Sequence, residues 1–404
     1  MDVILTNMIG LLLVAIFVAI AAHRLRLPYT VGLVVTGIAL VFSPFHAHVT
    51  LTHDVIFDVI LPPLLFEAAI NIHWRDLRQD ALPILSLAVL GTLIAAVFVA
   101  AGLVCGLGWP LRSALLFGVL IAATDPVAVI AMFKDNGITG RLRLLVESES
   151  LANDGVAAVL FTLVLAWSQT TGNQAATAGD IAQALLITVG GGVLSGMVFA
   201  AAAIVIAGRT ADHLVESTLT LVVAYGSFFM AERFHCSAVL ATVTAGLLMG
   251  NLGILADGEH SRISQRGREF TLELWDFFAF IANSLVFLLI GLTVAGIAVT
   301  KLGDMPLLII ICLVLIGRAV TVYPLCLAFM RSRWRIPFNL QHVLWWGGLR
   351  GALGLALALS LDPSLQMRDQ ILVATFGVVV FSVVVQGLTM PLVLRTAGAS
   401  RSKA

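Results

Sequence analysis

Two short stretches decide how this chain folds: Thr124-Asp125-Pro126, in the middle of one apolar segment, and Glu149-Ser150-Leu151-Ala152-Asn153-Asp154-Gly155, at the start of the next. Asp125 and Asp154 fall at depths where a helix embedded in a bilayer rarely carries a charge. An aspartate at the centre of a membrane helix costs roughly 2.5–3.5 kcal/mol on insertion scales, so its presence indicates function. We therefore interpret the pair as a site for a small cation or for protons.

The composition identifies the class of protein. Sixty per cent of the 404 residues are hydrophobic, 11% are charged, and the mean hydropathy is +1.03. A soluble chain of this length needs far more charge to cover its surface. The sequence therefore predicts an all-α polytopic membrane protein in contact with lipid. The net charge of zero by itself says nothing about nucleic-acid partners, and the cysteines and histidines show no metal-ligand spacing. For a chain of this class we expect no nucleic-acid partner and no cofactor.

About thirteen transmembrane helices are predicted from apolar runs that approach or exceed the roughly 20 residues needed to cross a bilayer. They cover residues 3–22, 29–43, 53–71, 82–107, 113–133, 147–168, 180–207, 216–232, 236–250, 271–299, 305–330, 341–361 and 369–395. Most of the basic residues fall in the loops after the odd-numbered spans and at the C-terminus. By the positive-inside rule, this distribution places the N-terminus outside and the C-terminus in the cytoplasm.

Two of the predicted spans are interrupted. Pro126 removes a backbone donor in the middle of its span and clashes with the preceding turn, so the helix should open there. The second interruption is the glycine-rich run of residues 347–354, which contains Arg350. Membrane helices tolerate single proline and glycine residues, but two interrupted helices in the two halves of a chain, each beside a charge, indicate a transporter site at the bilayer midplane.

The polar cluster at the start of the sixth span offers oxygen ligands. Ser150 and Asp154 are four residues apart and share a helix face, and Glu149 and Asn153 share the adjacent face. A hard monovalent cation prefers a cage of carboxylate, hydroxyl and carbonyl oxygens. We expect the ligands of such a cation, the metal site of this chain, to be Asp125, Asp154, Ser150 and the carbonyl of Thr124.

Three further charges lie well inside spans: Glu67, Arg318 and Arg350. A buried arginine needs a carboxylate partner, because an unpaired buried charge strongly destabilises the fold. Glu149 is the candidate partner, and spacing alone leaves the choice between Arg318 and Arg350 open. Glu67 is either a direct ion ligand or a carboxylate at the entrance to the site.

Five motifs in order along the chain resemble those of NhaP/NHE-type sodium–proton antiporters, the monovalent cation:proton antiporter-1 family. They are Leu61-Pro62-Pro63-Leu64-Leu65-Phe66-Glu67-Ala68-Ala69, Ala123-Thr124-Asp125-Pro126-Val127-Ala128-Val129, Glu149-Ser150-Leu151-Ala152-Asn153-Asp154-Gly155, Gly317-Arg318-Ala319-Val320 and Gly348-Leu349-Arg350-Gly351-Ala352. They run from the third predicted span to the twelfth.

The resemblance implies an NhaA-like antiporter fold of thirteen helices with inverted repeats, in which the broken helices 5 and 12 cross. It implies an ion-carrying core over residues 82–168 and 305–395 and a dimerisation part over residues 1–81 and 180–299, within one transporter of residues 1–404. Transport in this family is elevator-like, and the protein is expected to be a homodimer in the plasma membrane, the inner membrane of a bacterium, with a role in pH homeostasis.

The resemblance also assigns residue roles. Asp154, Asp125, Ser150, Thr124 and Glu67 match the ion-binding and proton-carrying site. Asn153 matches its hydrogen-bonding neighbour, and Glu149 matches the acid of a structural ion pair, with Arg318 favoured as its partner over Arg350. The Asn-Asp pair implies electroneutral exchange of one cation per proton.

We therefore expect a secondary active antiporter, and not an enzyme, that exchanges Na⁺ for H⁺, with Li⁺ or K⁺ as further possible substrates. A K⁺/H⁺ antiporter of the same fold is the alternative. A cation channel is a third hypothesis, and it would conduct without proton coupling. An intramembrane hydrolase that uses Asp125 and Asp154 as an acid–base dyad is a fourth.

Overall fold

The computed structural model describes residues 2–25, 27–42, 51–135, 137–169, 178–210, 212–255, 263–296 and 303–398. All regular secondary structure within these ranges is helical. Eight helices there are long and apolar enough to cross a membrane, and shorter apolar helices accompany them. Each of the thirteen predicted spans contains a helix, so the prediction of an all-α polytopic membrane protein is confirmed.

The longest helices are continuous over a full bilayer thickness. They are α1 (Asp2–Leu25), α9 (Arg141–Gln169), α10 (Ala178–Ala207), α11 (His213–Arg233), α13 (Gln265–Gly296) and α14 (Asp304–Ala328). At 1.5 Å of rise per residue, even the shortest of them is long enough to cross the roughly 30 Å hydrocarbon core of a bilayer. Other spans are built from consecutive shorter elements.

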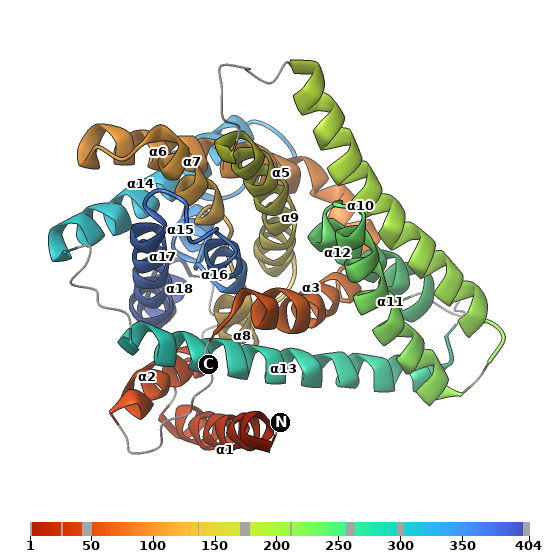
Figure 1. Ribbon diagram of the computed structural model, residues 1–404. Helices are drawn as coiled ribbons and strands as arrows, with labels where there is room; N and C mark the ends of the chain where they lie inside the picture. The colour runs from red at the N-terminus through yellow and green to blue at the C-terminus, as the bar shows by residue number, and fades with distance from the viewer. Residues whose placement is uncertain are drawn as a thin grey trace. The chain divides into compact units, whose positions relative to one another are not determined.

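The chain divides into two compact units. The first unit comprises Met1–Ile56, Leu82–Asn153 and Asn283–Ala404. Within it, α6 (Thr92–Leu107) packs against α14 and against α7 (Leu111–Leu120), and α14 also contacts α15 (Phe338–Trp346) and α17 (Arg368–Phe381) (Figure 1). The helices α7 and α15 are the first halves of the two interrupted spans, so α6 and α14 pack directly against these spans.

Several helices of the first unit follow one another with little or no gap. The span predicted at 82–107 consists of α5 (Ala81–Leu85), a π-helical turn (Ser86–Gly91) and α6. The last span consists of α17, a second π-helical turn (Ser382–Gln386) and α18 (Gly387–Thr396). The helix α2 (Tyr29–Val41) packs on this second π-helical turn. These wide turns shift the register of side chains along each span.

The second unit comprises Phe57–Ala81 and Asp154–Ala282. It contains α3 (Leu61–Ile70), α4 (Trp74–Gln79), α10, α11 and α12 (Ala238–Met249), and α12 packs against α3, α10 and α11 (Figure 1). Its core joins large aromatic rings to small residues. The rings of Phe66 and Trp275 lie 4.5 Å apart, beside the buried alanines Ala200, Ala203 and Ala224.

A polar seam joins α11 to the start of α13 in the second unit. Glu216 is 1% exposed, and its carboxylate accepts hydrogen bonds from the backbone N–H (3.0 Å) and the hydroxyl (2.7 Å) of Ser264. A carboxylate at this position stabilises the positive N-terminal end of α13. The seam continues through the hydroxyl contact between Ser217 and Thr271.

Contacts alone define the two compact units. The helices α1 and α2 group with the first unit, and the part of α9 from Asp154 onward groups with the second. The functional division expected from the sequence, with a core over 82–168 and 305–395 and a dimerisation part over 1–81 and 180–299, stays a prediction.

Candidate ion-binding site

Both predicted interruptions are present in the first unit. The helix α7 ends at Leu120, residues 121–126 are not helical, and α8 (Val127–Asp135) begins directly after Pro126. In the other span, α15 ends at Trp346 and α16 (Ala352–Leu359) begins after residues 347–351. Each interruption leaves helix ends, with their free N–H and C=O groups, inside the protein.

The two interruptions meet at Asp125. Its backbone N–H donates to the carbonyl of Leu349 over 2.7 Å. Its carboxylate accepts from the N–H of Val127 at 2.9 Å and from the N–H of Ala352. One carboxyl group thus lies at the N-terminal ends of both α8 and α16, where the helix dipoles favour an anion. The predicted crossing of the two broken helices is therefore present, with an acid at its centre.

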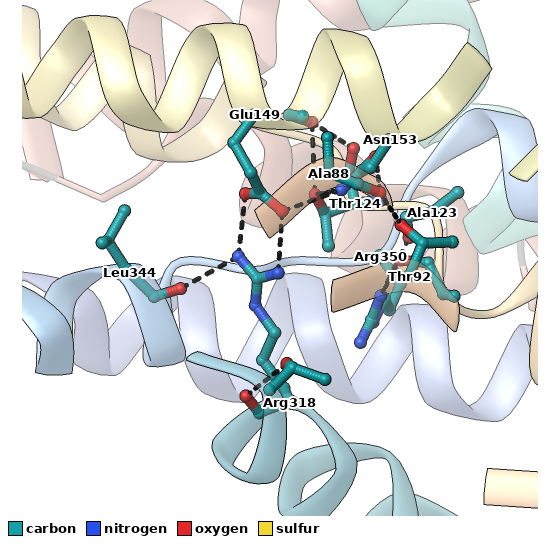
Figure 2. Close-up of polar contacts among 12 residues, drawn as sticks. Ala88, Thr92, Ala123, Thr124, Glu149, Asn153, Arg318, Leu344 and Arg350 are labelled. Carbon is teal, nitrogen blue, oxygen red and sulfur yellow. Dashed lines mark hydrogen bonds and ion pairs between the residues drawn. The ribbon is translucent and has the colours of Figure 1, made fainter. Parts of the chain in front are cut away.

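Arg350 occupies the opposite kind of helix end. Its side chain is 4% exposed, and Nη1 donates to the carbonyls of Ala122 (2.6 Å) and Ala123 (3.1 Å), just beyond the C-terminus of α7 (Figure 2). A cation is favoured at this end because the carbonyls there carry partial negative charge. Asp125 therefore stabilises the positive N-terminal ends of α8 and α16, and Arg350 stabilises the negative C-terminal end of α7.

Two glycines allow this close approach. A Cβ atom at Gly351 would lie 2.0 Å from Oδ2 of Asp125, and one at Gly348 would lie 2.6 Å from Nε of Arg318. Any larger residue would displace these charged side chains, since real Cβ atoms do not approach so closely. The glycine-rich run therefore serves the placement of charges as well as the interruption of the helix.

Glu149 pairs with Arg318. Nη1 and Nη2 of the arginine lie 2.8 Å from Oε1 and Oε2 of the glutamate, and Nη2 also donates to the carbonyl of Leu344 at 3.2 Å (Figure 2). The side chains of Glu149 and Arg318 are 3% and 8% exposed. The bidentate pair joins α9, α14 and the last turn of α15. Of the two arginines left open by spacing, Arg318 holds this place, and Arg350 contacts backbone carbonyls.

A hydrogen-bonded network connects the pair to the first interruption. Asn153 donates from Nδ2 to Oγ1 of Thr124 (2.7 Å) and to Oε1 of Glu149 (3.1 Å) (Figure 2). The hydroxyl of Ser150 donates to the backbone carbonyl of Thr124. Thr124, Ser150, Asn153 and Glu149 are all buried, so this part of α9 is fixed against residues 121–126.

Sequence reasoning missed a polar pair that supports the second interruption. The hydroxyl of Ser382 accepts from the backbone N–H of Arg350 (3.1 Å) and donates to Gln386 (2.6 Å), whose amide donates to the carbonyl of Trp346 (3.0 Å). Two polar residues four apart in an apolar span were the available signal, because such residues commonly bond between membrane helices.

The remaining two predicted site residues belong to the second unit. Asp154 follows Asn153 directly in α9 and is partly buried. Glu67, on α3, is also partly buried, and its Oε1 accepts from Nδ2 of Asn71 at 2.9 Å. The role of both acids as ion ligands stays a prediction.

Comparison with known proteins identifies the family. The family described as "Sodium/hydrogen exchanger, transmembrane" matches residues 11–396. This chain belongs to that family. The match includes both interrupted spans and the Glu149–Arg318 pair, so the charged crossing lies within the family's shared region.

Individual relatives agree with this assignment. This chain is 40% identical over 390 residues to the Na⁺/H⁺ antiporter ApNhaP of Aphanothece halophytica, covering 95% of this chain and 72% of the relative. It is 39% identical over 382 residues to the low-affinity Na⁺/H⁺ antiporter NhaS1 of Synechocystis, covering 92% and 69%. The solved structure of the sodium proton antiporter MjNhaP1 from Methanocaldococcus jannaschii superposes with a TM-score of 0.75 at 19% identity, covering 98% of this chain and 99% of that one. It shares the fold.

Proposed function

We propose that this protein is a secondary antiporter, and not an enzyme, that exchanges Na⁺ for H⁺ across a membrane. Its relatives ApNhaP and NhaS1 carry that activity in their names. The observation that carries the proposal is the position of Asp125, whose carboxylate lies at two helix N-termini in the interruption of two crossing spans. Interrupted helices of this kind provide carboxylate and carbonyl oxygens at the depth where transporters bind ions.

The proposed ligands come from the first interruption, residues 121–126, and from α9. They are Asp125, Asp154, Ser150 and Thr124, with Glu67 as a further acid. Thr124 and Ser150 already contact each other through their oxygens, which supports a shared oxygen cage. Asn153 is held by Thr124 and Glu149, so the turn of α9 that leads into Asp154 is fixed in place.

Coupling follows from competition at one carboxylate. Asp154 carries either a proton or the metal ion, and never both, so one flux drives the other. Asn153 is neutral and adds no second titrating group, which supports an exchange of one cation per proton without net charge movement. In this proposal, the protein is a homodimer and transports ions by an elevator-like movement. It lies in the plasma membrane, with the N-terminus outside and the C-terminus in the cytoplasm.

The test is cation-dependent proton flux in proteoliposomes that contain purified protein. The parent protein is expected to move protons in response to Na⁺, with Li⁺ and K⁺ measured side by side to establish selectivity. Asp154→Asn keeps the size and shape of the side chain but cannot hold a proton in exchange for a cation. Its flux is expected to fall to that of protein-free vesicles while its melting temperature stays near that of the parent.

Asp276→Asn provides the matched control, because Asp276 is an exposed aspartate on α13. This variant is expected to exchange at the parent rate. Retained exchange in Asp154→Asn removes the proposal. Cation flux that is independent of any pH gradient identifies a channel instead.

A further inference from the structure

A cavity of about 510 Å³ lies between α15 and α18 of the first unit. Its walls include Asn339, His342, Trp345 and Trp346 on α15 and Leu392 and Val393 on α18. Cavities of roughly 300–1,000 Å³ are typical of sites for small molecules. This cavity is distinct from the narrow space beside the crossing, which Thr124, Glu149 and Arg318 line.

The polar atoms of the aromatic residues that line the cavity already form hydrogen bonds within the protein. The indole N–H of Trp346 donates to Thr389 (2.9 Å), and that of Trp345 donates to the carbonyl of Leu315 (3.0 Å). Nδ1 of His342 lies 2.6 Å from the hydroxyl of Tyr323. The walls therefore offer mainly carbon surface to an occupant, which favours a hydrocarbon chain over a polar solute.

The ends of the two helices that form the cavity are basic. Arg395 is exposed on α18, between the lining residues Val393 and Thr396 along the chain. Three more exposed arginines, at positions 331, 333 and 335, precede the start of α15 at Phe338. Clusters of lysine and arginine at a membrane surface attract anionic head groups.

We propose that this cavity binds one acyl chain of an anionic phospholipid, whose phosphate contacts the basic residues at the ends of α15 and α18. Leu388 and Leu392, which are 42% and 60% exposed on α18, extend the apolar surface along the same helix for the rest of the lipid. Tryptophan is typical of such membrane–water boundaries. The lipid belongs to the cytoplasmic leaflet, a point that rests on the proposed orientation of the chain.

The test uses the full-length protein in proteoliposomes doped with phosphatidylglycerol that carries a photoreactive diazirine on its acyl chain. After irradiation, adducts mapped by mass spectrometry are expected to concentrate in residues 338–346 and 385–397. Val393→Trp fills the cavity, and its adducts in these two segments are expected to fall several-fold. Thr396→Trp, at an exposed lining position, serves if Val393→Trp does not fold.

The head group is tested with matched charge changes. Arg395→Gln is expected to lower labelling by the phosphatidylglycerol probe to the level given by a phosphatidylcholine probe. Arg209→Gln, which removes an exposed arginine from the second unit, is expected to label like the parent.

Equal labelling by the phosphatidylglycerol and phosphatidylcholine probes overturns the proposal that the lipid is anionic. Unchanged labelling in Val393→Trp or Thr396→Trp overturns the proposal that the acyl chain lies in this cavity. Cross-links between two copies through residues 338–346, formed without lipid, show that a second copy occupies the cavity and also overturn the proposal. Lipid labelling does not require ion transport. The labelling result therefore stands whether or not the protein exchanges Na⁺ for H⁺.

Discussion

Two buried acids of this protein are held in different ways. In the first unit, Glu149 faces the guanidinium of Arg318, with both N···O contacts at 2.8 Å. In the second unit, Glu216 accepts hydrogen bonds from two neutral donors, the backbone N–H and the hydroxyl of Ser264, at the start of α13. Both acids are at most 2% exposed. The ion pair is stable only while both charges are present, whereas neutral donors at a helix terminus tolerate a neutral acceptor far better.

The two regions also share a structural feature, the close approach of a glycine to a carboxylate. A glycine lies against a carboxylate in each, Gly351 against the half-buried Asp125 and Gly267 against the buried Glu216. A Cβ atom on these glycines would lie 2.0 Å and 1.8 Å from the nearest carboxylate oxygen. In the first unit this contact places an acid where an ion is proposed to bind. In the second unit it places an acid that closes a helix terminus. The same local geometry thus positions a proposed ion ligand in one place and an acid at a helix terminus in the other.

The largest expected effect comes from breaking the ion pair. Arg318→Ala leaves Glu149 buried without its cation, so the free energy of unfolding is expected to fall by about 3–5 kcal/mol. The measurement is the melting temperature and yield of the purified protein. Adding Glu149→Ala to the same chain is expected to restore part of the loss, since no unpaired charge then remains. An Arg318→Ala protein that melts like the parent contradicts this account of the pair.

A smaller effect is expected from Gly351→Ala. The new Cβ atom must displace the carboxylate of Asp125, which should cost about 1–3 kcal/mol of stability as other overpacked sites do and should raise the Na⁺ concentration needed for half-maximal exchange. Gly106→Ala is the control, because Gly106 is in α6 with nothing within 4 Å of its added Cβ. If both variants exchange alike, the contact between Gly351 and Asp125 does not position the acid.

The smallest effect is expected from Glu216→Gln. The amide oxygen of glutamine still accepts from Ser264, so the free energy of unfolding should change by only about 1 kcal/mol, and Na⁺/H⁺ exchange should proceed at the parent rate. Thermal unfolding and vesicle flux measure the two quantities. A loss of stability as large as that of Arg318→Ala would show that the charge of Glu216, and not its hydrogen bonds, holds α13 in place.

Much of the fold could be predicted because its signals are local. The hydropathy of each span and the break at Pro126 depend on neighbouring residues only, and the structure confirms both. The supporting pair Ser382–Gln386 could have been noticed from its spacing, but its contact with Arg350 could not. Glu216 carried no signal at all, since a glutamate in the first turn of a helix is commonly solvated.

The sequence by itself determined that this is a helical membrane protein with two interrupted spans and with charges at unusual depth. These features are readable because a charge or a proline in an apolar helix acts on the residues within about one turn of it. Only the tertiary structure decided which charges meet. Glu149 and Arg318 are 169 residues apart along the chain. The backbone N–H of Asp125, in the first interrupted span, donates to the carbonyl of Leu349, in the second. Such partners depend on how distant segments cross, and a pair of buried charges is chosen by that geometry and not by spacing along the chain.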